Sequence, residues 1–143
     1  MIRGFRGKYY FLSNFYDESL VEYEGLVYGN AEAAFHAQKD LSRAKQFTGL
    51  NPSEAKKLGR KVKLREDWEE VKDRIMYEIV KSKFELNSTM KEKLLGTKDN
   101  YLTEGNTWHD NYWGSCNCPR CNGKGDNKLG LILMRVRKEL GGK

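Results

Sequence analysis

The hydrophobic residues of this chain recur mainly at helical spacing. The clearest pattern predicts a helix over residues 66–86, and a second predicts a final helix over residues 129–140. The first stripe consists of Trp68, Val71, Ile75, Ile79 and Phe84, widened by Met76 and Val80. The second consists of Leu129, Ile132, Leu133, Val136 and Leu140. Helices therefore dominate the predicted structure.

Capping residues predict three shorter helices. Asn30 can cap a helix in the alanine-rich run that follows it. Asn51, followed by Pro at the first helical position, predicts a helix that ends at Leu58, and Ser88 predicts one that ends at Leu95. Gly59 and Gly96, which directly follow Leu58 and Leu95, would end these two helices.

The remaining segments lack helical periodicity. Residues 9–28 are rich in Tyr, Phe and Val and predict short strands or irregular extended chain. Residues 101–127 are rich in Gly, Asn and Asp and predict loop, with one strand at 101–104. We expect a mainly α fold, a single compact helical domain over residues 1–143 with a few short strands.

Composition narrows the function classes. No apolar run approaches the roughly 18 residues that span a membrane, and the N-terminus has no apolar secretory core, so we expect a cytoplasmic protein. The net charge is +6, and much of it lies in one basic stretch. That stretch contains Lys56, Lys57, Arg60, Lys61, Lys63 and Arg65. It favours phosphate-bearing partners, either nucleic acid or a nucleotide, although a solvated helix face would look the same. Neither a Rossmann fingerprint nor a P-loop is present.

The first chemically informative segment is YGNAEAAFHAQK. Glu32, Phe35, His36 and Lys39 would share one helix face, close to a helix N-terminus that favours anions. A carboxylate can stabilise the positive charge that develops when a glycosidic bond is cleaved. An amine can instead attack the anomeric carbon and form a Schiff base, provided that burial or a nearby cation lowers its pKa. The alternative is a surface stripe with a Glu–Lys pair.

The second segment is WHDNYWG, in which Trp108, Tyr112 and Trp113 surround Asp110. Aromatic side chains beside an acid suit a stacked heterocycle that also accepts or donates a hydrogen bond. The alternative is that one Trp fills the core while Asp110 caps a turn.

Three cysteines, Cys116, Cys118 and Cys121, form a C-x-C-x-x-C pattern in the same loop. A cytosolic protein does not use them as a disulfide framework, but three thiolates could bind zinc. A structural zinc site needs a fourth ligand, and the nearest candidates are His109 and Asp110. The alternative is a set of unligated thiols.

Seven motifs in order resemble the NADAR superfamily, also called YbiA-like proteins, over nearly the whole chain. They are FLSNFY, YGNAEAAFHAQK, GRKVKLREDW, KFELN, LTEGN, DNYWG and NKLGLILMRVR. The resemblance implies a compact, mostly helical fold and N-glycosidase activity. Members of the family hydrolyse phosphorylated early intermediates of riboflavin biosynthesis or remove ADP-ribose from guanine in nucleic acid.

The resemblance also implies site residues. Glu32, Lys39 and Asp110 would be catalytic. The expected substrate-binding residues, taken from the family motifs and from the two segments above, are Asn14, Phe15, Phe35, Arg60, Arg65, Glu104, Trp108, Trp113 and Gly114. No cofactor would be required, apart from a structural zinc at the cysteine loop. The family helix often opens with Ser or Thr where this chain has Asn30, which also caps well.

The sequence thus favours an N-glycosidase acting on ADP-ribosylated guanine in nucleic acid, because the basic stretch suits that partner. A phosphorylated riboflavin intermediate is the alternative substrate. Two other classes stay open, a module that binds ADP-ribose without cleaving it and a small zinc-containing nucleic-acid binder. The intact set of Glu32, Lys39 and Asp110 favours the enzyme, since a pure binding module would not need it.

Overall fold

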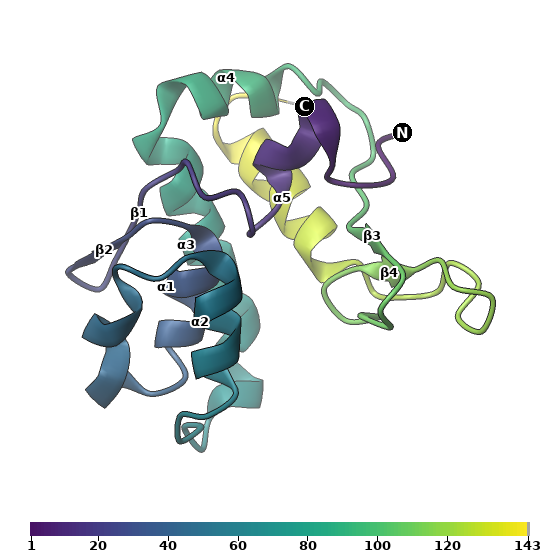
Figure 1. Ribbon diagram of the computed structural model, residues 1–143. Helices are drawn as coiled ribbons and strands as arrows, with labels where there is room; N and C mark the ends of the chain where they lie inside the picture. The colour runs from purple at the N-terminus through teal and green to yellow at the C-terminus, as the bar shows by residue number, and fades with distance from the viewer. Residues whose placement is uncertain (143) are drawn as a thin grey trace. The chain divides into compact units, whose positions relative to one another are not determined.

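The computed structural model describes residues 1–142 and divides into two compact units (Figure 1). The central unit is Asn14–Thr89, and the terminal unit combines residues 1–13 with residues 90–142. The helix α4, Ser88–Leu95, begins at the boundary between them.

In the central unit, helices pack around a small hairpin. Strands β1 (Val21–Tyr23) and β2 (Leu26–Tyr28) pair antiparallel. The helices are α1 (Ala31–Ala37), the 3₁₀ segment η2 (Leu41–Phe47), α2 (Pro52–Gly59) and α3 (Trp68–Leu86). Helix α1 packs against α2, η2 and α3, and α3 also packs along β1. The fully buried side chains at the centre of this unit include Tyr28, Phe47, Ile79, Val80 and Phe84. Helix α1 is therefore covered on most sides, which fixes the side chains that it carries.

The terminal unit joins the two ends of the chain. It contains the 3₁₀ segment η1 (Gly7–Leu12), most of α4, and α5 (Lys128–Glu139). Two-residue strands β3 (Gly105–Asn106) and β4 (Ser115–Cys116) pair in parallel. Its fully buried side chains include Leu12, Leu94, Leu102, Leu133 and Val136. Between β3 and α5 the chain is mostly loop, so the acidic and cysteine-bearing segments depend on local side-chain contacts for their shape.

The mainly α fold and all five predicted helices are confirmed, as are the caps at Asn30 and Asn51. The Asn30 side chain accepts a hydrogen bond from the Ala33 N–H at 2.7 Å, and Asn51 forms a reciprocal capping box with Glu54. The capping box explains why so short a helix as α2 begins at a definite residue. The expectation of one domain stays a prediction.

Two sequence predictions are wrong. Residues 9–12, the start of the segment predicted to be extended, belong instead to η1, because Gly7 at its first position takes the left-handed φ of 55° that turns the chain. The strand predicted at 101–104 is reduced to a single bridge between Leu102 and Ile2. The strand that does form, β3, begins at Gly105, directly after the predicted segment.

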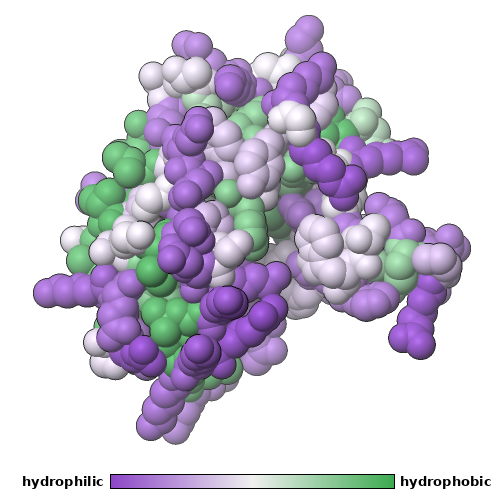
Figure 2. All heavy atoms as spheres, in the orientation of Figure 1, coloured by the Kyte–Doolittle hydropathy of each residue, from purple (hydrophilic) through white to green (hydrophobic). Residues whose placement is uncertain are grey.

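Polar character dominates the visible surface. Hydrophilic side chains cover much of the face in Figure 2, in keeping with the charged fraction of 32%. Among residues 1–142, no helix has both the length and the apolar character that crossing a bilayer requires.

Candidate active site

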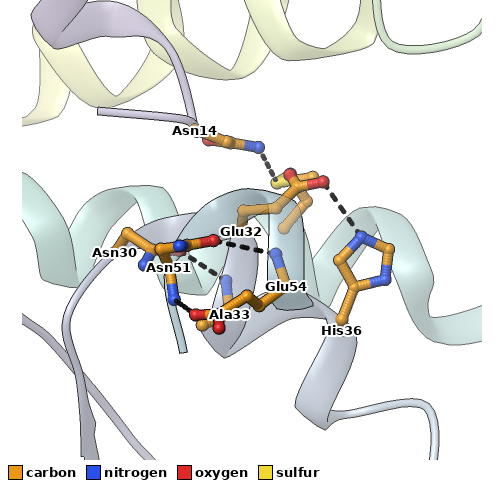
Figure 3. Close-up of polar contacts among 8 residues, drawn as sticks. Asn14, Asn30, Glu32, Ala33, His36, Asn51 and Glu54 are labelled. Carbon is orange, nitrogen blue, oxygen red and sulfur yellow. Dashed lines mark hydrogen bonds and ion pairs between the residues drawn. The ribbon is translucent and has the colours of Figure 1, made fainter. Parts of the chain in front are cut away.

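Glu32 lies in the first turn of α1, and the start of this helix is held by the chain itself (Figure 3). The Glu32 N–H donates to the Asn14 carbonyl at 3.2 Å, and the Ala34 N–H donates to the Asn30 carbonyl at 3.3 Å. The Asn30 side-chain oxygen accepts a hydrogen bond from the N–H group of the intervening residue, Ala33. Three of the N–H groups at this helix N-terminus therefore already have protein partners, which leaves fewer of them for an anion, and the expected anion site stays a prediction.

The Glu32 carboxylate has a histidine partner. Its Oε2 lies 3.0 Å from Nε2 of His36, one helical turn later, and both side chains are nearly buried. Behind the imidazole, Gly59 of α2 packs so closely that an added Cβ would overlap His36. His36 Nδ1 is buried and has no hydrogen-bond partner among the described residues. Close packing by Gly59 thus restricts the imidazole on one side, and its Nε2 faces the Glu32 carboxylate on the other.

Lys39 does not lie on the face of α1, as the sequence predicted, because the helix ends at Ala37 and Gln38 is its C-cap. Its backbone is nevertheless fixed, since the Arg65 N–H donates to the Lys39 carbonyl at 2.9 Å. Burial lowers the pKa of the Lys39 amine, Glu32 acts in the opposite direction, and Arg60 lowers it further. Lys39 is therefore an amine of lowered pKa within the electrostatic influence of Glu32, and a turn rather than helical spacing places it there.

Aromatic residues line the same part of the central unit. Phe35 is buried and packs against Trp68 with ring centroids 5.0 Å apart. The Lys39 ammonium nitrogen lies 5.8 Å from the centroid of the Trp68 ring. These contacts explain why Lys39 is partly desolvated, and they give Phe35 a packing role that the sequence did not predict.

Asn14 and Phe15 precede β1. Asn14 is buried, and its amide nitrogen donates to the Met76 sulfur at 3.3 Å. Its side-chain oxygen is buried without a hydrogen-bond partner among the described residues. Such an atom is costly unless a ligand or water completes it, which suits the predicted binding role. Phe15 lies beneath Lys56, whose nitrogen is 5.8 Å from the ring centroid.

The two predicted arginines differ. Arg60 is exposed, whereas Arg65 makes a two-pronged ion pair with Asp67, at 2.6 and 3.0 Å. The hydrogen bond to Asp67 raises the pKa of Arg65, and the same contact lowers the pKa of Asp67. Arg65 thus orients the chain beside Lys39, and Arg60 keeps its charge accessible.

In the terminal unit, two side chains shape the acidic loop. The buried Asn106 accepts hydrogen bonds from the N–H groups of Trp108 and Asp110, at 3.2 and 3.1 Å, and donates to the Asp110 carbonyl at 2.9 Å. Asp110 Oδ1 accepts from the N–H groups of Tyr112 and Trp113, at 3.2 and 2.9 Å. Asp110 therefore caps a turn, and Asn106 is a residue of this loop that sequence reasoning did not single out.

The other predicted site residues of the terminal unit differ in their exposure and packing. Trp108 is 59% exposed, and Trp113 is half-buried against Tyr112, with ring centroids 4.9 Å apart. Glu104 is half-buried, and its carbonyl accepts from the Ser115 N–H at 2.9 Å. A Cβ at Gly114 would collide with the Glu104 backbone, so this glycine allows the two segments to touch.

The cysteine loop contains a fourth ligating side chain. His109, Cys116, Cys118 and Cys121 place their ligand atoms within 4.8 Å of one another. Of the two candidates for a fourth ligand, the structure brings His109 to the sulfurs. Burial raises the pKa of the Cys116 thiol, but hydrogen bonds from the Cys118 and His109 backbone and from neighbouring thiols lower it to about 6. The cluster has the composition of a metal site.

Comparisons with known proteins identify a family and several relatives of this chain. A family model described as the NADAR domain matches residues 4–141. The N-glycosidase YbiA of Shigella boydii is 34% identical over 125 residues, which cover 84% of this chain and 75% of that protein. A riboflavin biosynthesis protein of Vibrio vulnificus is 34% identical over 135 residues, 91% of this chain but 35% of that protein. The NMR structure of YbiA from E. coli superimposes with a TM-score of 0.79 at 30% identity and covers 97% of this chain and 82% of that one.

Proposed function

This chain belongs to the NADAR domain family, and from that premise we propose that it is an N-glycosidase, which hydrolyses the bond between an anomeric sugar carbon and a base nitrogen. The observation that carries the proposal is the nearly buried Glu32 carboxylate, 3.0 Å from His36 Nε2, in the same region as Lys39, an amine whose pKa burial lowers. An exposed Glu–Lys pair would have no such shift. The names of its N-glycosidase relatives support the same reaction.

In the proposed mechanism Lys39 is the nucleophile. Its neutral amine attacks the anomeric carbon, and the new carbon–nitrogen bond replaces the bond to the base. The two amine protons go to the departing base nitrogen and to the ring oxygen, which opens the sugar. Water then hydrolyses the imine, supplies the aldehyde oxygen and returns both hydrogens to Lys39.

Glu32 relays the proton that reaches the departing base, and its carboxylate stabilises positive charge at the anomeric carbon. His36 is a positioning residue, since its Nε2 holds one carboxylate oxygen at 3.0 Å and leaves the other oxygen for the substrate. Asp110 is kept as a second catalytic candidate in its own loop, where its Oδ1 serves the turn and Oδ2 is the oxygen that would act on a ligand.

We propose a small phosphorylated ribosyl compound as the substrate, of the kind found early in riboflavin biosynthesis. The name of the Vibrio vulnificus relative supports this choice. ADP-ribosylated guanine in nucleic acid is the second candidate, and one observation favours it. Lys57, Arg60, Lys61 and Lys63 are all exposed around the end of α2, where they could contact a phosphate backbone.

The proposed chemistry needs no cofactor, and a zinc ion at the cysteine loop would have a structural role. The test is incubation of the purified protein with each of the two substrates, followed by mass spectrometry of the products. Release of free base from either substrate would support the proposed N-glycosidase activity. Tight binding of ADP-ribose without release of base would instead favour a non-catalytic binding module.

Borohydride trapping tests the role of Lys39. We expect a covalent adduct on the wild-type protein during turnover and none on Lys39→Ala, and the rate should fall as pH drops below the pKa of Lys39, because protonation removes the nucleophile. Lys45, an exposed lysine of η2, provides the matched control Lys45→Ala. An inactive Lys39→Ala without any adduct on the wild type would leave Lys39 an electrostatic role only. Normal turnover by Lys39→Ala would exclude both roles.

A further inference from the structure

In the cysteine loop, the distances from the histidine nitrogen to the three sulfurs are those of a tetrahedral metal site. Nδ1 of His109 lies 3.5 Å from Sγ of Cys118, 3.4 Å from Sγ of Cys121 and 3.7 Å from Sγ of Cys116. Zinc–sulfur bonds of about 2.3 Å and zinc–nitrogen bonds of about 2.0–2.1 Å imply nitrogen–sulfur distances of about 3.5–3.6 Å around one ion. The observed distances bracket that value.

The backbone is folded around the sulfurs. The Cys121 N–H points at Cys118 Sγ, at 3.4 Å, and the Gly123 N–H donates to the Cys116 carbonyl at 2.7 Å. His109 has a φ of 69°, a left-handed conformation that is uncommon for residues other than glycine. Strained conformations of this kind persist where the surroundings impose them, and here the strain turns the imidazole toward the thiols.

The chemistry of the ligands selects the ion. Three thiolates and one imidazole are the donor set of structural zinc, whereas calcium and magnesium prefer oxygen. Three cysteines cannot all be paired in disulfides within one chain, and each of them is free. The four protein ligands fill a tetrahedron, so no position is left for a bound water.

A second set of contacts connects this cluster to the acidic loop. The Asn111 side chain donates to Cys121 Sγ at 3.5 Å and accepts from the Cys116 N–H at 3.3 Å, while its carbonyl accepts from the Asp126 N–H at 2.8 Å. Asn111 directly follows Asp110 and His109. Residues 108–113 are thus bound to the cysteine turn at both the histidine and the asparagine.

We propose that His109, Cys116, Cys118 and Cys121 bind one structural Zn²⁺ that holds residues 108–113, with Asp110 and Trp113, in a fixed conformation. The ion does not take part in the chemical step. The metal site and its hold on the loop stand without the proposed function; only a consequence for turnover rests on it.

The experiment measures metal content and loop order separately from activity. Elemental analysis of the full chain should find about one Zn²⁺ per molecule, as a four-ligand site requires, and Cys118→Ser and His109→Ala should reduce this to near zero. Arg120→Ala is the control, because Arg120 is exposed in the same turn and carries no ligand. If these ligand variants fail to fold, chelated wild-type protein titrated with Co²⁺ should show the absorption of tetrahedral thiolate-bound cobalt.

Loop order is read from the indole N–H signals of the three tryptophans in nitrogen-15 NMR spectra. Chelation should shift or broaden the signals of Trp108 and Trp113 and leave that of Trp68 unchanged, and Zn²⁺ should restore them. Absence of zinc together with an octahedral cobalt spectrum would overturn the site. Zinc binding that leaves Trp108 and Trp113 unaffected would overturn its hold on the loop. Both readouts stay valid if the protein hydrolyses neither substrate, so the two proposals can fail independently.

Discussion

Two regions carry the predicted site residues, and they are held in place by different means. In the central unit, Glu32 is positioned by a capped helix whose faces are buried by α2, η2 and α3. In the terminal unit, Asp110 is positioned by hydrogen bonds from side chains to backbone, above all those of Asn106. Packing spreads the stability of the first region over many contacts, whereas the second depends on a few polar groups.

The difference also concerns what each region offers a substrate. The helix-based region contains a nearly buried acid, its histidine partner and a half-buried amine, which suits proton transfer and nucleophilic attack. The loop region contains aromatic side chains, of which Trp108 is largely exposed, and these suit recognition of a planar base. Substitutions in the first region should therefore change turnover, and those of Asn106 and the aromatic residues in the second should change stability and binding.

The largest expected effect is that of Glu32→Gln. The amide keeps the shape of the side chain but cannot relay a proton, so turnover should fall by about 100-fold or more, as for other positioned acids and bases. The melting temperature should hardly change. Glu85→Gln, at an exposed position of α3, is the matched control. Activity within about tenfold of wild type would exclude Glu32 from the chemical step.

Asn106→Ala should have the next largest effect, this time on folding. It would leave the partly buried N–H groups of Trp108 and Asp110 and the Asp110 carbonyl without their protein partner, at a cost of about 1–3 kcal/mol in the free energy of unfolding. Urea unfolding would measure it, with Thr107→Ala as the exposed control. Equal stability of the two variants would show that water replaces Asn106 and that the loop is not held by it.

Trp113→Ala separates binding from packing in the loop. If Trp113 stacks on the base of the substrate, the variant should bind a substrate analogue more weakly by about 1–3 kcal/mol and keep its fold. Calorimetric titration together with thermal unfolding measures both quantities. A large loss of stability with unchanged affinity of the folded fraction would make Trp113 a packing residue against Tyr112.

The smallest effect is expected for Asn51→Ala, which removes the cap of α2. The free energy of unfolding should decrease by about 1 kcal/mol, because the Glu54 N–H loses its partner at 2.8 Å. Ser53→Ala, exposed in the same turn, should be nearly neutral. Turnover per folded molecule should stay constant. A large change in turnover would mean that loss of the N-cap alters the position of Gly59 at the other end of α2.

The same contrast explains how much the sequence could predict. Hydrophobic periodicity and caps predicted every α-helix, because these signals are local and repeat along the chain. The family motifs identified Glu32 and Lys39 as site residues, but helical spacing predicted Lys39 to lie on the same helix as Glu32. In the structure that helix ends at Ala37, two residues before Lys39. Where a short helix stops depends on packing by other segments, here the return of Arg65 to the Lys39 carbonyl.

In the loop region the residues were identified but not their connections. The three cysteines were visible as a pattern, whereas the choice of His109 over Asp110 depends on the left-handed turn at His109. Asn106 lies in the motif LTEGN and gave no sign of its central role, since asparagine is common in loops. The 3₁₀ segments η1 and η2 were also missed, because such short turns carry no periodicity.

The close packing of Gly59 against His36 has a consequence for sequence variation. Positions 36 and 59 lie in different helices, yet a side chain at 59 would need the volume that the imidazole occupies. A relative that carries alanine or a larger residue at 59 should therefore carry a smaller residue at 36, and its acid at 32 would then lack this partner. Substitutions at the two positions should compensate for each other, so that the pair varies together although neither residue is a neighbour of the other in sequence.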